Sequence, residues 1–377
     1  MRRVEVRPRP GWQERLEADG FPIHTADGPY WDESVCYELD AAEANRIEAA
    51  TNELHGRCLE AVEHVIRERL YPRLGLPELA VPLIERSWSA LDGAGAPSIY
   101  GRMDLACGDG PPKLLEYNAD TPTALIEAAV LQWRWLEETS PGADQLNSIH
   151  ERLVAGWKDL APWLEAPLHF SALDVPEDVL AASYLQDTAA QAGLETRFVE
   201  IRDLGWDARR RAFLDLDGRP VASLFKLYPW EWLLAEPFGV HLPEASTAFV
   251  EPPWKLILSG KGILAVLWEL FPDHPNLLPA FFDPHGMEDY ARKALYGREG
   301  AEVTLFEGGR EVAGGARAAL SREGFVYQAL APLRPHDGKW PVVGSWLVQG
   351  EAAGIGIREA DGRITDDGSR FVPHRLR

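Results

Sequence analysis

Residues 102–120 read RMDLACGDGPPKLLEYNAD, two strand-like runs around a Gly/Pro turn. A turn in the middle of this stretch makes the flanking strands an antiparallel hairpin. The pairing then places Asp104 opposite Glu116 and Arg102 opposite Asn118. Because side chains alternate between the two faces of a strand, all four point the same way.

The two facing carboxylates in this hairpin need a counter-charge. Directly opposed Cβ atoms lie about 5 Å apart, and like charges at that distance destabilise a hairpin. A divalent cation removes the repulsion, and the side chains of Asp104, Glu116 and Asn118 offer hard oxygen ligands suited to Mg²⁺. The alternative is an exposed hairpin whose acids face water, with Arg102 pairing one of them.

The composition limits the classes of partner. The chain has 377 residues, 46% of them hydrophobic, which allows two or three domains or one unit of several lobes. Its formal net charge of −21 argues against nucleic acid or an anionic membrane as the main partner. A local basic pocket for phosphates remains compatible with that charge.

The sequence predicts a cytoplasmic protein. No apolar run follows the basic N-terminus, so no signal peptide is expected, and no apolar stretch is long enough to span a membrane. The three cysteines form no CxxC pair, which indicates neither a disulfide framework nor a zinc site and favours a reducing compartment.

The pattern along the chain predicts an α+β fold with mixed sheets and flanking helices, in one multi-lobed unit without a clear linker. Residues 1–98 read as an irregular segment to about residue 40 and then a helix over 41–69. Residues 99–260 hold the hairpin, a helix starting at Thr121-Pro122, and alternating strands and helix with a hairpin turn at Asp217-Gly218. Residues 261–377 read as a loop feeding a helix, followed by strands.

Six blocks, in order, resemble the synthetase part of the glutathionylspermidine synthase family. They are RMDL…KLLEYNADTPT (102–123), FKLYPWEW (225–232), EPPWKLILSGKGILAVLWELFPDHPNLLPA (251–280), YARKALYGREGAEV (290–303), FVYQAL (325–330) and GSWLVQGEAAGIGIRE (344–359). The resemblance implies an ATP-grasp-like fold and an enzyme that uses ATP and Mg²⁺ to join a carboxylate to an amine through an acyl-phosphate.

Within the hairpin block, the resemblance makes Asp104, Glu116 and Asn118 the Mg²⁺ ligands, in agreement with the hairpin argument. It makes Arg102, Thr121 and Thr123 contacts of the acid substrate. For the two threonines, helix capping is the alternative role.

For the nucleotide, the resemblance implies that Lys261 and Lys293 bind phosphates and that the segment at Gln328 and Leu330 reads the adenine through its backbone. A helix is expected to begin just after Lys261, and the backbone N–H groups at a helix N-terminus favour phosphate binding. The alternative is that Lys261 is an ordinary surface lysine. FVYQAL alone reads as a core strand. Residues 296–300 resemble the flap that covers the triphosphate.

Arg358, in GIGIRE, is expected to be catalytic, because a permanently charged guanidinium suits a developing oxyanion or a transferring phosphoryl group. A surface ion pair is the alternative role for a lone arginine.

The sequence departs from the family at the acceptor side. Arg370 stands where the family places a carboxylate that receives a polyamine, whereas Glu231 still matches a substrate-side carboxylate. An arginine there would repel a polycation and favours an amino acid or small peptide as the amine substrate. Residues 1–98 hold no counterpart of the cysteine hydrolase half of bifunctional members.

The leading hypothesis is therefore a ligase acting on a small-molecule acid and amine. The alternative is a non-catalytic ATP-binding or regulatory protein that retains the fold. A metal-dependent hydrolase is disfavoured, because no HExxH or other His-rich cluster is present. The sequence leaves the two substrates and the oligomeric state open.

Overall fold

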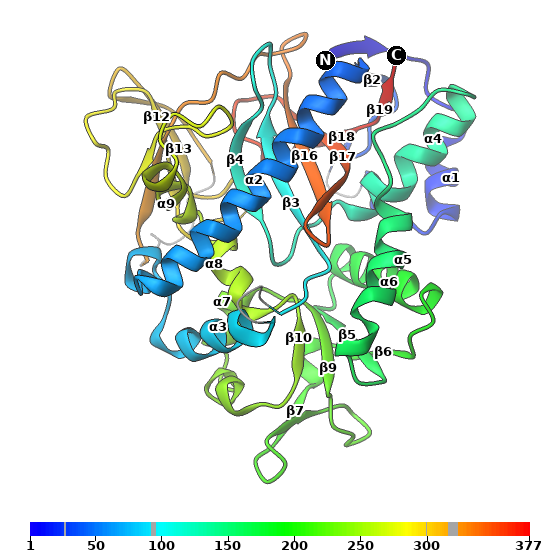
Figure 1. Cartoon of the computed structure of the whole chain (residues 1–377). Coiled ribbons are helices and arrows are strands. Elements are labelled where there is room, and N and C mark those ends of the chain that lie inside the picture. The colour runs from blue at the N-terminus through cyan, green and yellow to red at the C-terminus, as the bar shows by residue number, and fades with distance from the viewer. Residues whose placement is uncertain (26–27, 92–95, 299, 316–322) are drawn as a thin grey trace.

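The computed structural model describes residues 1–25, 28–91, 96–298, 300–315 and 323–377. Its centre is a five-stranded antiparallel sheet that joins segments far apart in the chain (Figure 1). In spatial order the strands are β18 (Arg370–Val372), β17 (Glu351–Ala360), β16 (Trp340–Val348), β3 (Tyr100–Ala106) and β4 (Lys113–Asn118). One face of this sheet packs against the long helix α2 (Ala41–Arg67), where the hydroxyls of Thr51 and Ser345 lie 2.7 Å apart.

A second sheet lies beside the β4 edge and forms a separate lobe with the adjoining helix α9 (Figure 1). It is antiparallel. Its strands are β11 (Ala280–Phe281), β15 (Phe325–Ala329), β12 (Tyr290–Ala294), β13 (Val303–Glu307) and β14 (Arg310–Gly314). The short helices before it are α8 (Leu256–Ser259) and α9 (Ile263–Leu270).

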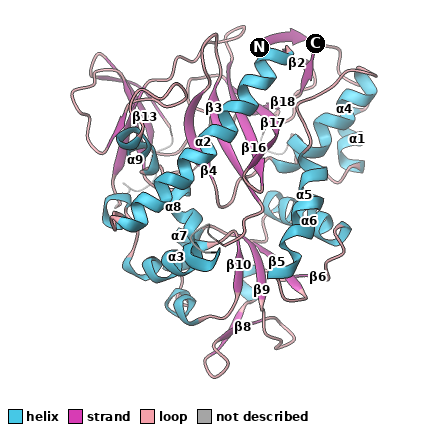
Figure 2. Ribbon diagram, viewed as in Figure 1, coloured by secondary structure: helices cyan, strands magenta, loops and turns pink. Residues whose placement is uncertain are grey.

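A parallel sheet forms the third part of the molecule (Figure 2). Its strands are β10 (Ala248–Val250), β9 (Ser223–Leu227), β5 (Leu168–Ala172) and β6 (Thr196–Phe198). Around these sheets lie the helices α1 (Trp12–Ala18), α3 (Val81–Trp88), α4 (Gln132–Thr139), α5 (Ile149–Leu160), α6 (Pro176–Gln191) and α7 (Trp230–Ala235). The α+β class with mixed sheets is thus confirmed.

The two chain ends lie together in a small sheet (Figure 1). Its strands are β1 (Arg2–Glu5), β2 (Val35–Leu39) and β19 (His374–Leu376). Sheets therefore cross the predicted boundaries near residues 98 and 260, because strands from different regions pair with one another.

Local sequence explains the elements that were predicted well. The helix predicted over 41–69 is α2, and a capping box begins it: Asp40 accepts from the Glu43 amide at 2.8 Å, and Glu43 accepts from the Asp40 amide at 2.9 Å. The predicted hairpin is β3 and β4, with Asp104 paired to Glu116 and Arg102 paired to Asn118. Both predicted pairs are confirmed, and a β-bulge next to Asp104 shifts the register by one residue toward the turn, where Leu105 pairs with Leu114.

Two predictions about local structure were wrong. The helix after Thr121 begins only at Leu125, because Ala124 has a φ of 63°, which no right-handed helix contains. The segment before residue 40 is not irregular throughout, since it contains β1, α1 and β2.

The turn predicted at Asp217-Gly218 is confirmed. It follows β8 (Ala212–Leu214), which also pairs with β7 (Gly205–Asp207). Beyond the turn, Pro220 forms an antiparallel bridge with Leu214 and the Val221 amide donates to the Phe213 carbonyl at 2.8 Å, before the chain enters β9 in the parallel sheet. Every residue of β9 is buried, which requires cover on both faces of its sheet.

Candidate active site

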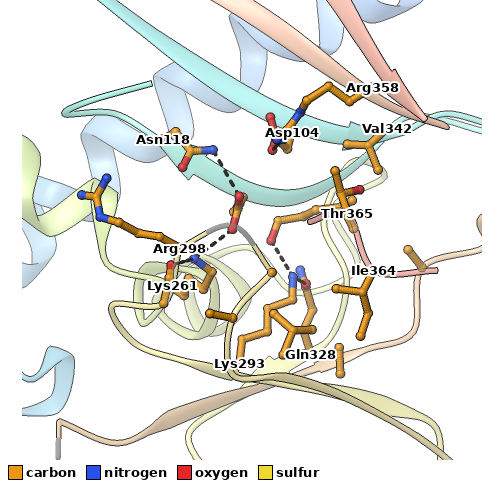
Figure 3. Close-up of a pocket in the computed structure, with 18 of the residues that line it drawn as sticks. Asp104, Asn118, Lys261, Lys293, Arg298, Gln328, Val342, Arg358, Ile364 and Thr365 are labelled. Atoms are coloured by element: carbon orange, nitrogen blue, oxygen red, sulfur yellow. Dashed lines mark hydrogen bonds and ion pairs between the residues drawn. The ribbon is translucent and has the colours of Figure 1, made fainter. Parts of the chain in front are cut away.

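The hairpin carries its functional side chains on the sheet face opposite α2 (Figure 3). Asp104 lies between Glu116 on β4 and Gly344 on β16. A Cβ atom at Gly344 would come within 2.8 Å of the Arg102 side chain. This glycine therefore provides the space in which Arg102 and Asp104 lie against the sheet.

Asp104 is held by two arginines. Arg102 Nε donates to Asp104 Oδ1 at 2.7 Å, and Arg358 Nη2, from β17, donates to Oδ2 at 2.7 Å. Arg102 is itself buried and also donates to the Thr123 carbonyl at 2.6 Å. The predicted repulsion between Asp104 and Glu116 is thus compensated by protein cations, because β17 belongs to the same sheet and Arg358 reaches Asp104 across the intervening strand β16.

Glu116 has its own cation. Lys261 Nζ, from the loop before α9, lies 2.9 Å from Glu116 Oε2 and donates to the Gly297 carbonyl at 2.6 Å. The Asn118 amide donates to Glu116 Oε1 at 3.2 Å. Burial alone would raise the pKa of Glu116, but the Lys261 and Lys293 charges outweigh it and hold that pKa well below its ordinary value.

The nucleotide-side residues come from β12 and β15. Lys293 Nζ donates to Gln328 Oε1 at 2.7 Å and to the Leu115 carbonyl at 2.8 Å. Gln328 Nε2 in turn donates to the Leu114 carbonyl at 2.9 Å. The Gln328 side chain is therefore occupied in holding Lys293 against β4, and Gln328, Ala329 and Leu330 all line the cavity.

Lys293 gives a pH prediction. Burial, only partly offset by the Glu116 charge, lowers the pKa of Lys293 to about 8. The affinity for Mg-ATP is expected to fall as the pH rises through about 8, because Lys293 then loses the charge that attracts phosphate. Calorimetric titration across that range tests this. A Lys293→Arg variant keeps its charge and should show a flatter profile; an unchanged pH profile in that variant would contradict the assignment.

One cavity collects most of the predicted site residues (Figure 3). Its open space is about 1220 Å³. The predicted residues that line it are Arg102, Asp104, Glu116, Asn118, Thr121, Thr123, Lys261, Lys293, Gln328, Leu330 and Arg358. Among the described lining residues the cationic ones are Arg102, Lys261, Lys293, Arg298, Arg358 and Arg363, whereas the acidic ones are Asp104 and Glu116. An acidic protein thus contains a cationic cavity, which suits a polyphosphate.

Glu231 lies beside this cavity rather than in its lining. Arg298 joins it to the threonine segment: Arg298 Nη2 lies 3.0 Å from Glu231 Oε1, and Nη1 lies 3.0 Å from the Thr121 hydroxyl. Arg298 belongs to the predicted flap at 296–300, of which Glu299 lies outside the described residues. The predicted capping role of Thr121 and Thr123 fails, since the helix starts beyond them.

The structure does not bring Arg370 to the cavity. In the β17–β18 pair, Arg358 faces Phe371 and Glu359 faces Arg370, so Arg370 lies on the opposite face of the sheet from Arg358. Its guanidinium contacts Asp361 at 2.9 Å and Asp32 at 3.6 Å. The argument from Arg370 against a polycationic substrate therefore loses its structural basis.

Sequence reasoning missed an acidic group near the two arginines. Burial raises the pKa of Glu177, and the nearby side chains of Thr123, Arg358 and Arg102 partly offset this effect. Burial and the neighbouring Glu177 raise the pKa of Asp178 to about 6. Pro176-Glu177-Asp178 reads in sequence as an ordinary helix start, with proline and acids in the first turn, so it gave no signal of a site.

A metal ion would have to use the hairpin donors. Within the described parts of the chain, no three His, Cys, Asp or Glu side chains gather as a metal cluster. The two carboxylates and one amide of the hairpin face fit Mg²⁺, which takes few protein ligands and completes its shell with water and phosphate.

The comparisons with known proteins give the family. A family model described as "Glutathionylspermidine synthase preATP-grasp" matches residues 3–377. The chain belongs to this family. The resemblance found in the six blocks is confirmed. This is a family of ATP-dependent amide-bond ligases, so the protein is a C–N ligase.

Individual relatives of this glutathionylspermidine synthase family member differ in length. A Haemophilus influenzae protein provisionally named acid–amine ligase is 39% identical over 393 residues, which cover 99% of both chains. The bifunctional glutathionylspermidine synthetase/amidase of Escherichia coli is 27% identical over 369 residues, covering 89% of this chain and 58% of that one. The chain thus spans a little over half the length of the Escherichia coli enzyme.

Among solved structures, a Methylobacillus flagellatus protein provisionally named γ-glutamylcysteine synthetase matches 86% of this chain and 87% of its own, with a TM-score of 0.45 and 11% identity. No helix in the described ranges combines the length and apolar character needed to cross a lipid bilayer.

Proposed function

We propose that this protein uses ATP and Mg²⁺ to join a small-molecule carboxylate to an amine through an acyl-phosphate. The observation that carries the proposal is the hairpin face, where Asp104 stands opposite Glu116 in a cavity whose other charged lining residues, among those described, are cations. Opposed acids in a phosphate-binding cavity suit a cation that bridges nucleotide and protein. Family membership supports the reaction class.

The hairpin side chains Asp104, Glu116 and Asn118 would hold Mg²⁺. When bound, Mg²⁺ neutralises charge on the phosphate oxygens as the γ-phosphoryl group moves. Lys261 and Arg358 now pair with these same carboxylates. Binding of a cation there would free Lys261 to contact phosphate and Arg358 to contact the reacting carboxylate.

The remaining roles follow from position. Lys261 and Lys293 hold the phosphates, and the backbone at Gln328 and Leu330 borders the adenine. Arg102 orients the substrate carboxylate. Arg358 stabilises the oxyanion that forms when the amine attacks the acyl-phosphate.

The amine would approach from the acidic side of the cavity. Glu231, Glu177 and Asp178 lie beside the cavity rather than in its lining: Glu231 contacts Arg298, and Glu177 lies near Arg358 and Asp178. Their carboxylates would attract a protonated amine. Because its pKa is raised to about 6, the deprotonated Asp178 carboxylate is a stronger base than an ordinary aspartate and is suited to accept a proton from the amine before attack.

The test is a screen of acids and amines for ADP release, with glutathione and spermidine as the first pair. ADP release that needs both substrates, together with a product of the mass expected for the amide, supports the proposal. Mg-ATP binding without ADP release under every substrate pair would instead favour the non-catalytic ATP-binding protein.

A further inference from the structure

A buried ion pair lies outside the catalytic cavity. Lys226 Nζ, on β9, lies 2.6 Å from Asp120 Oδ1, and the two side chains are 0% and 1% exposed. Lys226 Nζ also donates to the Tyr228 carbonyl at 3.0 Å. Burying two charges costs free energy that a well-packed apolar pair would not cost, so stability alone does not explain this pair.

Asp120 connects two distant segments. Its second oxygen, Oδ2, accepts from the Trp230 amide at 2.9 Å. Asp120 directly precedes Thr121 after β4, and Trp230 directly precedes Glu231 in α7. Lys226 Nζ also lies 4.4 Å from the centre of the Trp230 ring. A single carboxylate therefore fixes Thr121 and Glu231 relative to each other.

Buried polar atoms without a hydrogen-bond partner among the described residues lie between Thr121 and Glu231. Arg298 donates to both residues, at 3.0 Å each, and lies 5.3 Å from the ring centre of Trp232. Glu231 Oε2 and Arg298 Nε are both buried, and no protein group bonds to either within the described ranges. Unpaired buried polar atoms are costly, so a ligand group that pairs with them would be favoured here.

We propose that Asp120 and Lys226 are positioning residues that set the spacing between Thr121 and Glu231, and so determine how well the acid and amine bind. Neither residue lines the cavity. The predicted nucleotide residues Lys261, Lys293 and Gln328 lie on the loop before α9, β12 and β15, outside this segment, and Arg298 of the predicted flap links the two parts. The claim that Asp120 and Lys226 affect substrate binding rests on the proposed function. The claim that they fix the positions of Thr121 and Glu231 does not.

The test variant is Asp120→Asn with Lys226→Met. It removes both charges together, which buried pairs tolerate far better than loss of one partner, and the asparagine oxygen can still accept from Trp230. The KM for glutathione, with spermidine saturating, is expected to rise at least about tenfold, because small displacements of substrate contacts cost much activity. The affinity for Mg-ATP should stay within about twofold, because its ligands lie on other elements.

A second readout needs no substrate. Hydrogen–deuterium exchange of residues 121–124 and 230–233 is expected to become faster in the double variant, whereas exchange in β12 and β15 stays unchanged. If the parent enzyme does not use glutathione, the proposed function fails in that respect, but the exchange result still decides the inference.

The matched control is Arg9→Met with Glu33→Gln, a second buried pair whose side chains are 5% and 0% exposed. It should change stability without changing the KM for glutathione or the exchange at residues 121–124. An equal change in KM and in exchange in this control would contradict the proposal, because it would mean that Asp120 and Lys226 contribute only to overall stability.

If the double variant does not fold, Asp120→Glu replaces it, since it keeps the charge and lengthens the side chain by one methylene. Parental KM and parental exchange in the folded variant would overturn the proposal.

Discussion

The Asp104→Asn variant is expected to lose at least roughly 10³-fold in ATP-dependent ligation, because metal-assisted charge neutralisation contributes several kcal/mol to such reactions. The change removes one of two opposed carboxylates and leaves fewer hard oxygen ligands for Mg²⁺. Rates of ADP release measured over a Mg²⁺ titration should show both a lower maximum and a weaker Mg²⁺ dependence.

The stability of this variant gives an independent check. Asp104 pairs with Arg102 and Arg358, so its neutralisation should lower the melting temperature somewhat rather than raise it by relief of repulsion. Asp361→Asn is the matched control, because Asp361 is exposed and pairs with Lys339 and Arg370 away from the cavity. Full activity and unchanged Mg²⁺ affinity in the Asp104→Asn variant would show that the hairpin is not the metal site.

The Arg358→Met variant is expected to lose roughly 10²–10³-fold in kcat, the usual effect of deleting one group that stabilises an oxyanion. Because Arg358 contacts Asp104 and not the nucleotide-side residues Lys293 and Gln328, Mg-ATP affinity should change much less than kcat. Single-turnover measurements of amide formation separate this effect from nucleotide binding.

Arg370→Met is the matched control for this variant. Arg370 lies on the neighbouring strand but on the other face of the same sheet. The activity of the Arg370→Met variant and its preference among amines should therefore equal those of the parent enzyme. A kcat loss in Arg370→Met as large as that in Arg358→Met would mean that the sheet, rather than the cavity, is being damaged.

Much of the site was determined by local sequence. The Gly/Pro turn between two strand-like runs indicated the hairpin and the meeting of Asp104 and Glu116. Strand alternation and an approximate turn position are local properties. The β-bulge between this pair and the turn, where the register shifts by one residue, was not predicted. The helix of residues 41–67 likewise follows from its apolar spacing and the Asp40–Glu43 capping box.

Other features were decided only by the tertiary structure. Which cation pairs with each carboxylate depends on β17 and the loop before α9 reaching the hairpin, more than 140 residues away along the chain. The face to which Arg370 points depends on its register against β17. Asp120 and Lys226 read in sequence as ordinary polar residues, because their burial and their contact with Trp230 arise only when three segments pack. Long-range pairing of charges depends on the positions of whole elements, which no local pattern of residues encodes.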